Sequence, residues 1–312
     1  MRLAERTNAR RTLPVVPGTT IGRSASRTSD VGTRPGEVVV NYPLDAGGVG
    51  DYPVKVGSML LTLVEPNPGF ERAYNRWYER DHYYAGCLVG PWLFAGSRWV
   101  APRRLKDRRW PADSVIADPV DAGSYVAIYW VEQGHHDDHF EAWAVPQVRE
   151  LYAGGRGFPE RTHVHTALFN HLASAYRDDD PVPVELALDH HYDGLFILWW
   201  DARSGTADQL HRQLAADHLG PLLDGSDIEI ASAWVPSVPD EGPRDVPMDL
   251  GSPAGGTDRL VQLLFVGGDT EATVDRVRTY TEGVMAAGLA DLLLAAPFFR
   301  TVIGTDTYVD EL

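Results

Sequence analysis

Short apolar runs alternate with segments of helical periodicity along most of the chain. The run at 59–65, MLLTLVE, ends in a Pro-Asn-Pro-Gly turn, as a buried strand does. Over 70–82, aromatic and apolar residues recur at spacings of three and four. This spacing predicts an amphipathic helix whose inward stripe ends at the ionisable pair Asp81-His82. Glycines end this helix, and a strand rich in tryptophan and phenylalanine is predicted at 92–100.

The following segments complete one structural unit. Residues 125–131 (YVAIYWV) are apolar on both alternating faces, which predicts a strand that is covered on both sides. Residues 139–152 have helical periodicity, and residues 163–176 alternate as a strand does. The order strand, helix, strand, strand, helix, strand is that of a ferredoxin-like unit.

A second copy of this pattern follows a polar linker at 178–183. It predicts strands and helices in the same order, at 195–200, 207–223, 228–235, 260–266, 273–288 and 292–303. The pair Asp81-His82 recurs as Asp217-His218, at a spacing of 218 − 82 = 136 residues. We therefore expect two tandem units of the same kind.

The predicted fold class is α+β, with two tandem ferredoxin-like (βαββαβ) units packing as an intramolecular α/β barrel of the dimeric type. One face of each sheet is covered by its own helices, and the other must be covered by the second unit. The interior of such a barrel is expected to hold a ligand. The expected division is a low-order extension at 1–55, a first unit at 56–178 and a second unit at 179–312.

Composition narrows the choice of partners. The chain has 312 residues, 44% of them hydrophobic, and a net charge of −16 from 28 basic and 44 acidic side chains. Such a surface repels phosphate backbones and anionic lipids, so neither nucleic acid nor a membrane is an expected partner. The one cysteine, Cys87, excludes an internal disulfide and favours a reducing, cytoplasmic location. The expected partner is a small-molecule substrate, and the sequence leaves monomer and homodimer open.

The stretch FERAYNRWYERDH resembles a motif of EthD-like proteins, a branch of the dimeric α/β-barrel superfamily. The matching residues are Tyr74, Asn75, Trp77, Tyr78 and His82. The Leu-Pro that commonly follows the histidine in relatives is replaced here by Tyr83-Tyr84. The resemblance implies the barrel fold. For the activity it implies a choice among cofactor-independent polyketide monooxygenases, polyketide cyclases, isomerases and haem enzymes such as chlorite dismutases.

His82 is the main catalytic candidate, because an imidazole on the inward stripe can exchange protons near neutral pH. Asp81 is a candidate orienting group, and Tyr78 and Tyr83 are candidate donors to a developing oxyanion. The alternative is that His82 caps the C-terminal end of its helix. The candidate substrate-binding residues are the aromatic side chains of Trp77, Tyr83, Trp92, Trp99 and Tyr129.

His163 and His165 are secondary catalytic candidates. At positions i and i+2 of a strand, their side chains are expected on one face, where they could also hold a metal ion. A polar edge strand is the alternative. If their face lines the barrel interior, both histidines would converge with His82.

Together these observations favour an enzyme that acts on a small apolar or aromatic, polyketide-like metabolite. It would use general acid/base chemistry without a cofactor, as an isomerase, cyclase or lyase. The alternatives are an oxygen-dependent monooxygenase of the same fold and a non-catalytic metabolite-binding protein. Haem, or a metal ion held by His163 and His165, stays open. The sequence has no glycine-rich nucleotide loop, zinc-protease motif or hydrolase nucleophile elbow, which disfavours those chemistries.

Overall fold

The computed structural model describes residues 54–237 and 246–312. These residues all belong to one compact unit. Apart from residues 54 and 55, the predicted extension at 1–55 lies outside the described residues.

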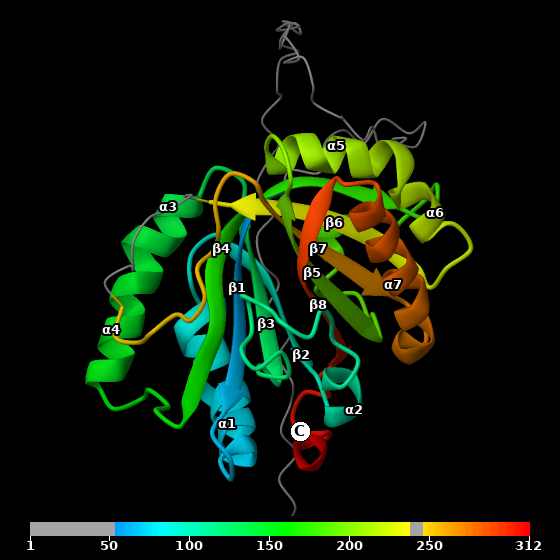
Figure 1. The fold of residues 1–312 in the computed structure, drawn as a ribbon. Helices are drawn as coiled ribbons and strands as arrows, with labels where there is room; N and C mark the ends of the chain where they lie inside the picture. Colours follow the sequence, from blue (N-terminus) through cyan, green and yellow to red (C-terminus); the bar gives the residue numbers. More distant parts are fainter. Residues whose placement is uncertain (1–53, 238–245) are drawn as a thin grey trace, which may run out of the picture. The chain divides into compact units, whose positions relative to one another are not determined.

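The first half of the described chain has the predicted order of strands and helices (Figure 1). Its elements are β1 (Val56–Pro66), α1 (Glu71–Trp77), the π-helix η1 (Tyr78–Leu88), β2 (Leu93–Val100), α2 (Arg103–Lys106), β3 (Tyr125–Glu132), α3 (His136–His139), the π-helix η2 (Phe140–Ala144), α4 (Val145–Ala153) and β4 (Arg161–Tyr176). The first helix, which glycines were predicted to end, runs through Gly86 in π geometry and ends at Leu88. His82 therefore lies inside a helix and does not cap one.

The second half repeats the order. Its elements are β5 (Gly194–Ala202), α5 (Ala207–Asp217), α6 (Leu219–Leu223), β6 (Ile228–Pro236), β7 (Arg259–Val266), α7 (Thr270–Ala286) and β8 (Ala290–Arg300). The expected boundary between residues 178 and 179 lies in the segment that joins β4 to β5, which also holds the short 3-10 helix η3 (Val184–Leu186). A second short 3-10 helix, η4 (Val309–Glu311), follows β8.

The strands form one closed barrel in the order β1-β3-β2-β8-β5-β7-β6-β4, and β4 pairs with β1 to close it. Within each half the order is that of a ferredoxin-like sheet: β4-β1-β3-β2 in the first and β8-β5-β7-β6 in the second. The two joints are β2 with β8 and β4 with β6, so each joint pairs the second strand of one half with the fourth of the other. The predicted fold of two tandem ferredoxin-like units is confirmed.

Large side chains from both halves fill the barrel interior. They include Met59, Leu61, Trp99, Trp130, Phe169, Trp199, Trp234, Phe265 and Phe298, each fully buried. The indole of Trp130 on β3 stacks on that of Trp234 on β6, with ring centroids 6.0 Å apart. An interior of eight strands is just wide enough for side chains to occupy it. The expectation that the interior holds a ligand is therefore wrong.

The outer faces of the two half-sheets are covered in different ways. Over the second half, Trp110 from the loop between β2 and β3 crosses β8. Its carbonyl accepts the N–H of Ala295 at 2.7 Å, and its indole N–H donates to Thr281 on α7 at 3.0 Å. Over the first half, the loop between β6 and β7 crosses β4, and the carbonyl of Leu250 accepts the N–H of Thr166 at 2.8 Å.

Trp110 and Leu250 therefore occupy corresponding places. Ala295 pairs with Leu198 on the first strand of its half, as Thr166 pairs with Thr62 on β1. The indole of Trp110 belongs to the apolar layer between the second sheet and its helices. Leu250, with its smaller side chain, borders a cavity instead.

Candidate functional site

A pocket of about 460 Å³ lies between the outer face of β1 and β4 and the helical segments η1, η2 and α4. Residues 246–255, hereafter the strap, close it from the side of the second half. Gly251 lets the strap lie on β4, because it has φ +76° and a side chain there would meet the carbonyl oxygens of His163 and Val164 within 2.4 Å. The site is thus built on the first half and completed by the second.

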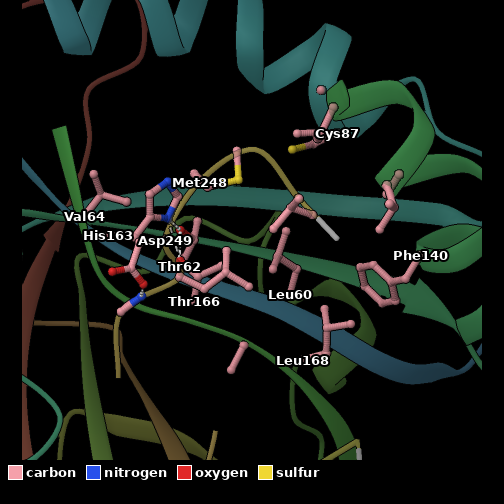
Figure 2. A pocket seen from close by; sticks show the side chains of 18 of the residues that line it. Leu60, Thr62, Val64, Cys87, Phe140, His163, Thr166, Leu168, Met248 and Asp249 are labelled. Atoms are coloured by element: carbon pink, nitrogen blue, oxygen red, sulfur yellow. Dashed lines mark hydrogen bonds between the residues drawn. The ribbon is translucent and has the colours of Figure 1, made fainter. Parts of the chain in front are cut away.

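The pocket is polar at one end and apolar at the other. Figure 2 shows Thr62, His163, Thr166 and Asp249 gathered on one side, with Leu60, Phe140 and Leu168 on the other. His82 and Arg161 also line the pocket, and the charge of Arg161 acts on both His82 and His163. The shape suits a molecule with an apolar body and one polar group.

Both helical walls of the pocket contain π-helix. It spans 11 residues in η1 and five in η2, and such segments are frequent at functional sites. In η1 the ring of His82 lies against Gly86, where an added Cβ would come within 2.7 Å of its Nδ1 and Cε1 atoms. The glycine therefore allows the imidazole to pack on the backbone of its own helix.

The imidazole of His82 also contacts two aromatic rings. It stacks on Trp77 at a centroid distance of 4.6 Å and meets the ring of Tyr78 edge-on at 5.2 Å. Within residues 54–237 and 246–312, its nitrogens make no hydrogen bond. Burial, with the positive charge of Arg161 second, lowers the pKa of His82 to about 3. The ring is thus neutral, and it lines the pocket.

His163 lines the same pocket with both of its nitrogens engaged. Arg161 Nε donates to Nε2 at 3.2 Å. A guanidinium only donates, so Nε2 is the acceptor and Nδ1 carries the proton. The Nδ1–H group donates a hydrogen bond to Thr166 Oγ1 at 2.7 Å. The hydroxyls of Thr166 and Thr62 are 2.8 Å apart. Burial and then Arg161 lower the pKa of His163 to about 3.

His165 faces the opposite way, and the prediction that it shares a face with His163 is wrong. A register shift between Leu63 and Val64 places His165 opposite Leu63, which faces the barrel core, and His163 opposite Val64, which faces the helices. His165 Nδ1 donates to the carbonyl of Ser252 at 3.0 Å. A single metal ion held by His163 and His165 does not fit this arrangement. The described residues contain no group of three or more potential metal ligands.

The other predicted site residues are placed as follows. Tyr78 borders the pocket, and its hydroxyl is 2.9 Å from that of Tyr129, which lies behind it. Burial raises the pKa of both phenols. Tyr83 donates its hydroxyl proton to the carbonyl of Gly96. Asp81 forms an ion pair with Arg156 at the surface.

The three predicted tryptophans lie outside the pocket lining. Trp77 supports His82 from behind, and its indole N–H donates to the carbonyl of Arg156 at 2.9 Å. Trp99 points into the barrel core. Trp92 is 45% exposed and stacks on His135 at a centroid distance of 3.6 Å.

The polar pocket residues that the sequence analysis missed include Thr62, Arg161, Thr166 and Asp249. Thr62 had a local signal, since it is the one hydroxyl within the apolar run at 59–65. Asp249 had none, because it reaches the site from the loop between β6 and β7 of the other half.

No protein-family model matches this chain, and no curated protein matches it. Among solved structures, it is similar to a provisionally named chlorite dismutase, with TM-score 0.48, 11% identity, and 83% of this chain and 100% of the other covered. An anthrone oxidase-like protein has TM-score 0.45, 9% identity and coverages of 79% and 92%. A provisionally named monooxygenase from Fusobacterium nucleatum has TM-score 0.44, 7% identity and coverages of 80% and 94%.

At such identities the likeness concerns the fold alone. These neighbours have the dimeric α/β-barrel fold. The narrower resemblance to EthD-like proteins stays a prediction. Among the described residues, no helix has the length and apolar character needed to cross a membrane.

Proposed function

We propose that this chain is an enzyme that moves protons on a small, largely apolar metabolite in the pocket of its first half, with His82 as general base and acid. The observation that supports this most is a contrast among the pocket histidines. His163 uses both nitrogens in hydrogen bonds, and His139 donates from Nδ1 to the carbonyl of Pro91 at 2.7 Å. His82 is the neutral imidazole whose nitrogens are unengaged within the described residues. A general base needs that open lone pair.

In the proposed step, His82 takes a proton from an acidic C–H or O–H group of the substrate. The bonding electrons stay on the substrate and delocalise into a neighbouring carbonyl or ring as an enolate or phenolate. Return of the proton to a different carbon completes an isomerisation, and departure of a leaving group from the next carbon completes an elimination. The substrate anion gives the new imidazolium a counter-charge, and the low polarity of the site strengthens this attraction.

An oxygen-dependent reaction is the second candidate, because the apolar end of the pocket around Leu60, Phe140 and Leu168 suits O2 as well as an apolar substrate. It would share the first step. The substrate carbanion would then reduce O2, and conversion of a CH2 group to C=O would consume one O2 and release one water. Oxygen uptake during turnover separates this reaction from isomerisation and elimination.

A simple carbon acid tests the proposal before the natural substrate is known. The probe is 2-tetralone, a bicyclic ketone with acidic C–H groups, whose uptake of deuterium from D2O is followed by proton NMR. We expect the wild-type protein to accelerate exchange and His82→Gln to lower that rate by about a hundredfold or more. His218→Gln, which changes the matching histidine of the second half, is the control and should leave the rate unchanged.

Two outcomes contradict the proposal. Equal exchange rates for the wild type and His82→Gln would remove His82 from the chemistry. Binding of 2-tetralone in the pocket without any acceleration over buffer would favour a non-catalytic metabolite-binding protein instead.

A further inference from the structure

Arg161, the first residue of β4, places a cation at the polar end of the pocket. It donates three hydrogen bonds: from Nε to His163, from Nη1 to the carbonyl of Phe158 at 2.9 Å, and from Nη2 to the hydroxyl of Tyr152. Its guanidinium also lies over the ring of Trp77, 4.6 Å from the centroid. A guanidinium carries five N–H groups, so 5 − 3 leaves two of them without a partner among residues 54–237 and 246–312.

All of these acceptors are uncharged, which sets Arg161 apart from its neighbours. Arg98, under η1, pairs with Glu79 at 3.1 Å, and Arg156 pairs with Asp81. Arg161 has no carboxylate within 4 Å among residues 54–237 and 246–312. A fixed, half-buried guanidinium with spare N–H groups is the arrangement that proteins use to bind carboxylates.

Asp249, which belongs to the strap, is the acidic residue at the same end of the pocket, and its carboxylate is bonded within the strap. Its Oδ1 accepts the N–H of Gly251 at 3.0 Å, and the residue is exposed. Among the charges that act on His163, Arg161 ranks first and Asp249 last. At His163 the charge of Arg161 therefore outweighs that of Asp249.

We propose that the pocket takes an aryl carboxylate whose carboxylate group is bound by Arg161 and whose rings lie among Leu60, Phe140 and Leu168. This inference rests on the proposed function, since it names the substrate class of that site. It adds a second role for the bound anion. Neutralising Arg161 removes the charge that most lowers the basicity of His82, so an anionic substrate makes its own base stronger.

The test compares 2-naphthoate with 2-naphthamide, a neutral analogue of nearly the same shape, by isothermal titration calorimetry. We expect the wild type to bind the acid at least tenfold more tightly than the amide. Arg161→Met should weaken the acid by about tenfold to a hundredfold and leave the amide unchanged, while Arg161→Lys should retain part of the preference. Asp249→Asn, which removes the opposite charge from the same end, should leave acid binding unchanged or tighter.

The wild-type comparison needs no variant, so it stands even if Arg161→Met folds poorly. Equal affinities for acid and amide, a preference that survives in Arg161→Met, weaker acid binding in Asp249→Asn, or failure of both probes to bind would each overturn the inference. A further measurement, the pKa of His82, would not change if Arg161 had a structural role alone. Saturating 2-naphthoate should raise the pKa of His82. Within the pH range in which circular dichroism shows the protein to be folded, the NMR shift of the His82 Cε1 proton should begin to change at a higher pH with the ligand than without it, and an unchanged onset counts against the inference.

The two proposals fail separately. Loss of the acid preference together with an intact dependence of deuterium exchange on His82 would overturn the role of Arg161 alone. An acid preference that depends on Arg161, with exchange that does not depend on His82, would overturn the proposed function alone.

Discussion

Buried neutral histidines should make the fold sensitive to mild acid. Burial is the leading cause that lowers the pKa of four of them: to about 3 for His82 and His163 and to about 4 for His165 and His171, from an ordinary value of 6.5. Three of the four lie on β4, and the fourth lies on η1. At mildly acidic pH the folded protein therefore binds fewer protons at these histidines than the unfolded chain does.

The sign follows from proton uptake. Below about pH 6.5 the unfolded chain binds a proton at each site and the folded chain does not, so the free energy of unfolding falls as pH drops from 6.5 toward 4. At pH 5, which is about 1.5 pH units below the unfolded pKa, each site lowers the free energy of unfolding by about 2 kcal/mol. Four sites together cost about 8 kcal/mol, which is comparable to the whole stability of a typical domain, about 5–15 kcal/mol. His139 and His211, whose pKa values burial also lowers, add to the same trend.

Urea unfolding followed by circular dichroism measures this loss. Between about pH 7.5 and pH 5, we expect the free energy of unfolding to fall by about 8 kcal/mol, with a slope near pH 5 of about four protons. His171→Gln lies away from the pocket lining and should remove about one proton from that slope. A free energy of unfolding that stays constant over this range would refute the assignment of neutral, buried histidines.

Three further predictions test the pocket. Leu250→Trp should fill the pocket, as Trp110 fills the corresponding layer of the second half. It should abolish binding of 2-naphthamide, measured by calorimetry, with little change in Tm. Undiminished binding would contradict the proposed correspondence between Leu250 and Trp110. Gly86→Ala should displace the ring of His82, because its Cβ would lie 2.7 Å from that ring, and it should slow deuterium exchange in 2-tetralone while 2-naphthamide still binds; an unchanged exchange rate would count against the placement of His82. The purified protein should show no Soret band in its visible spectrum, because the imidazole of His82 is stacked on Trp77. A Soret band that disappears in His82→Ala would identify haem instead.

The order of elements and the barrel could be predicted because they depend on local periodicity and on an internal repeat. A stripe over 70–82 or an apolar run at 125–131 carries its own signal. The pairing of edge strands then follows from two half-sheets, each with one uncovered face.

The site could be predicted only in part, because its geometry depends on contacts between distant segments. His82 and Tyr78 were found through the helical stripe. The split between His163 and His165 comes from one register shift against β1, which a single strand's sequence does not reveal. The location of the pocket was missed because it depends on which space the side chains leave unfilled. Trp110 fills the layer over the second half-sheet, whereas the smaller Leu250 at the corresponding place leaves a cavity over the first.

A crystal structure of the complex with 2-tetralone would test the central claim most directly. We expect the probe between β1, β4 and α4 of the first half, with its acidic carbon within about 3.5 Å of a ring nitrogen of His82. Probe density in the barrel interior or in the second half, or in the pocket with His82 turned away from it, would contradict the proposed role of His82.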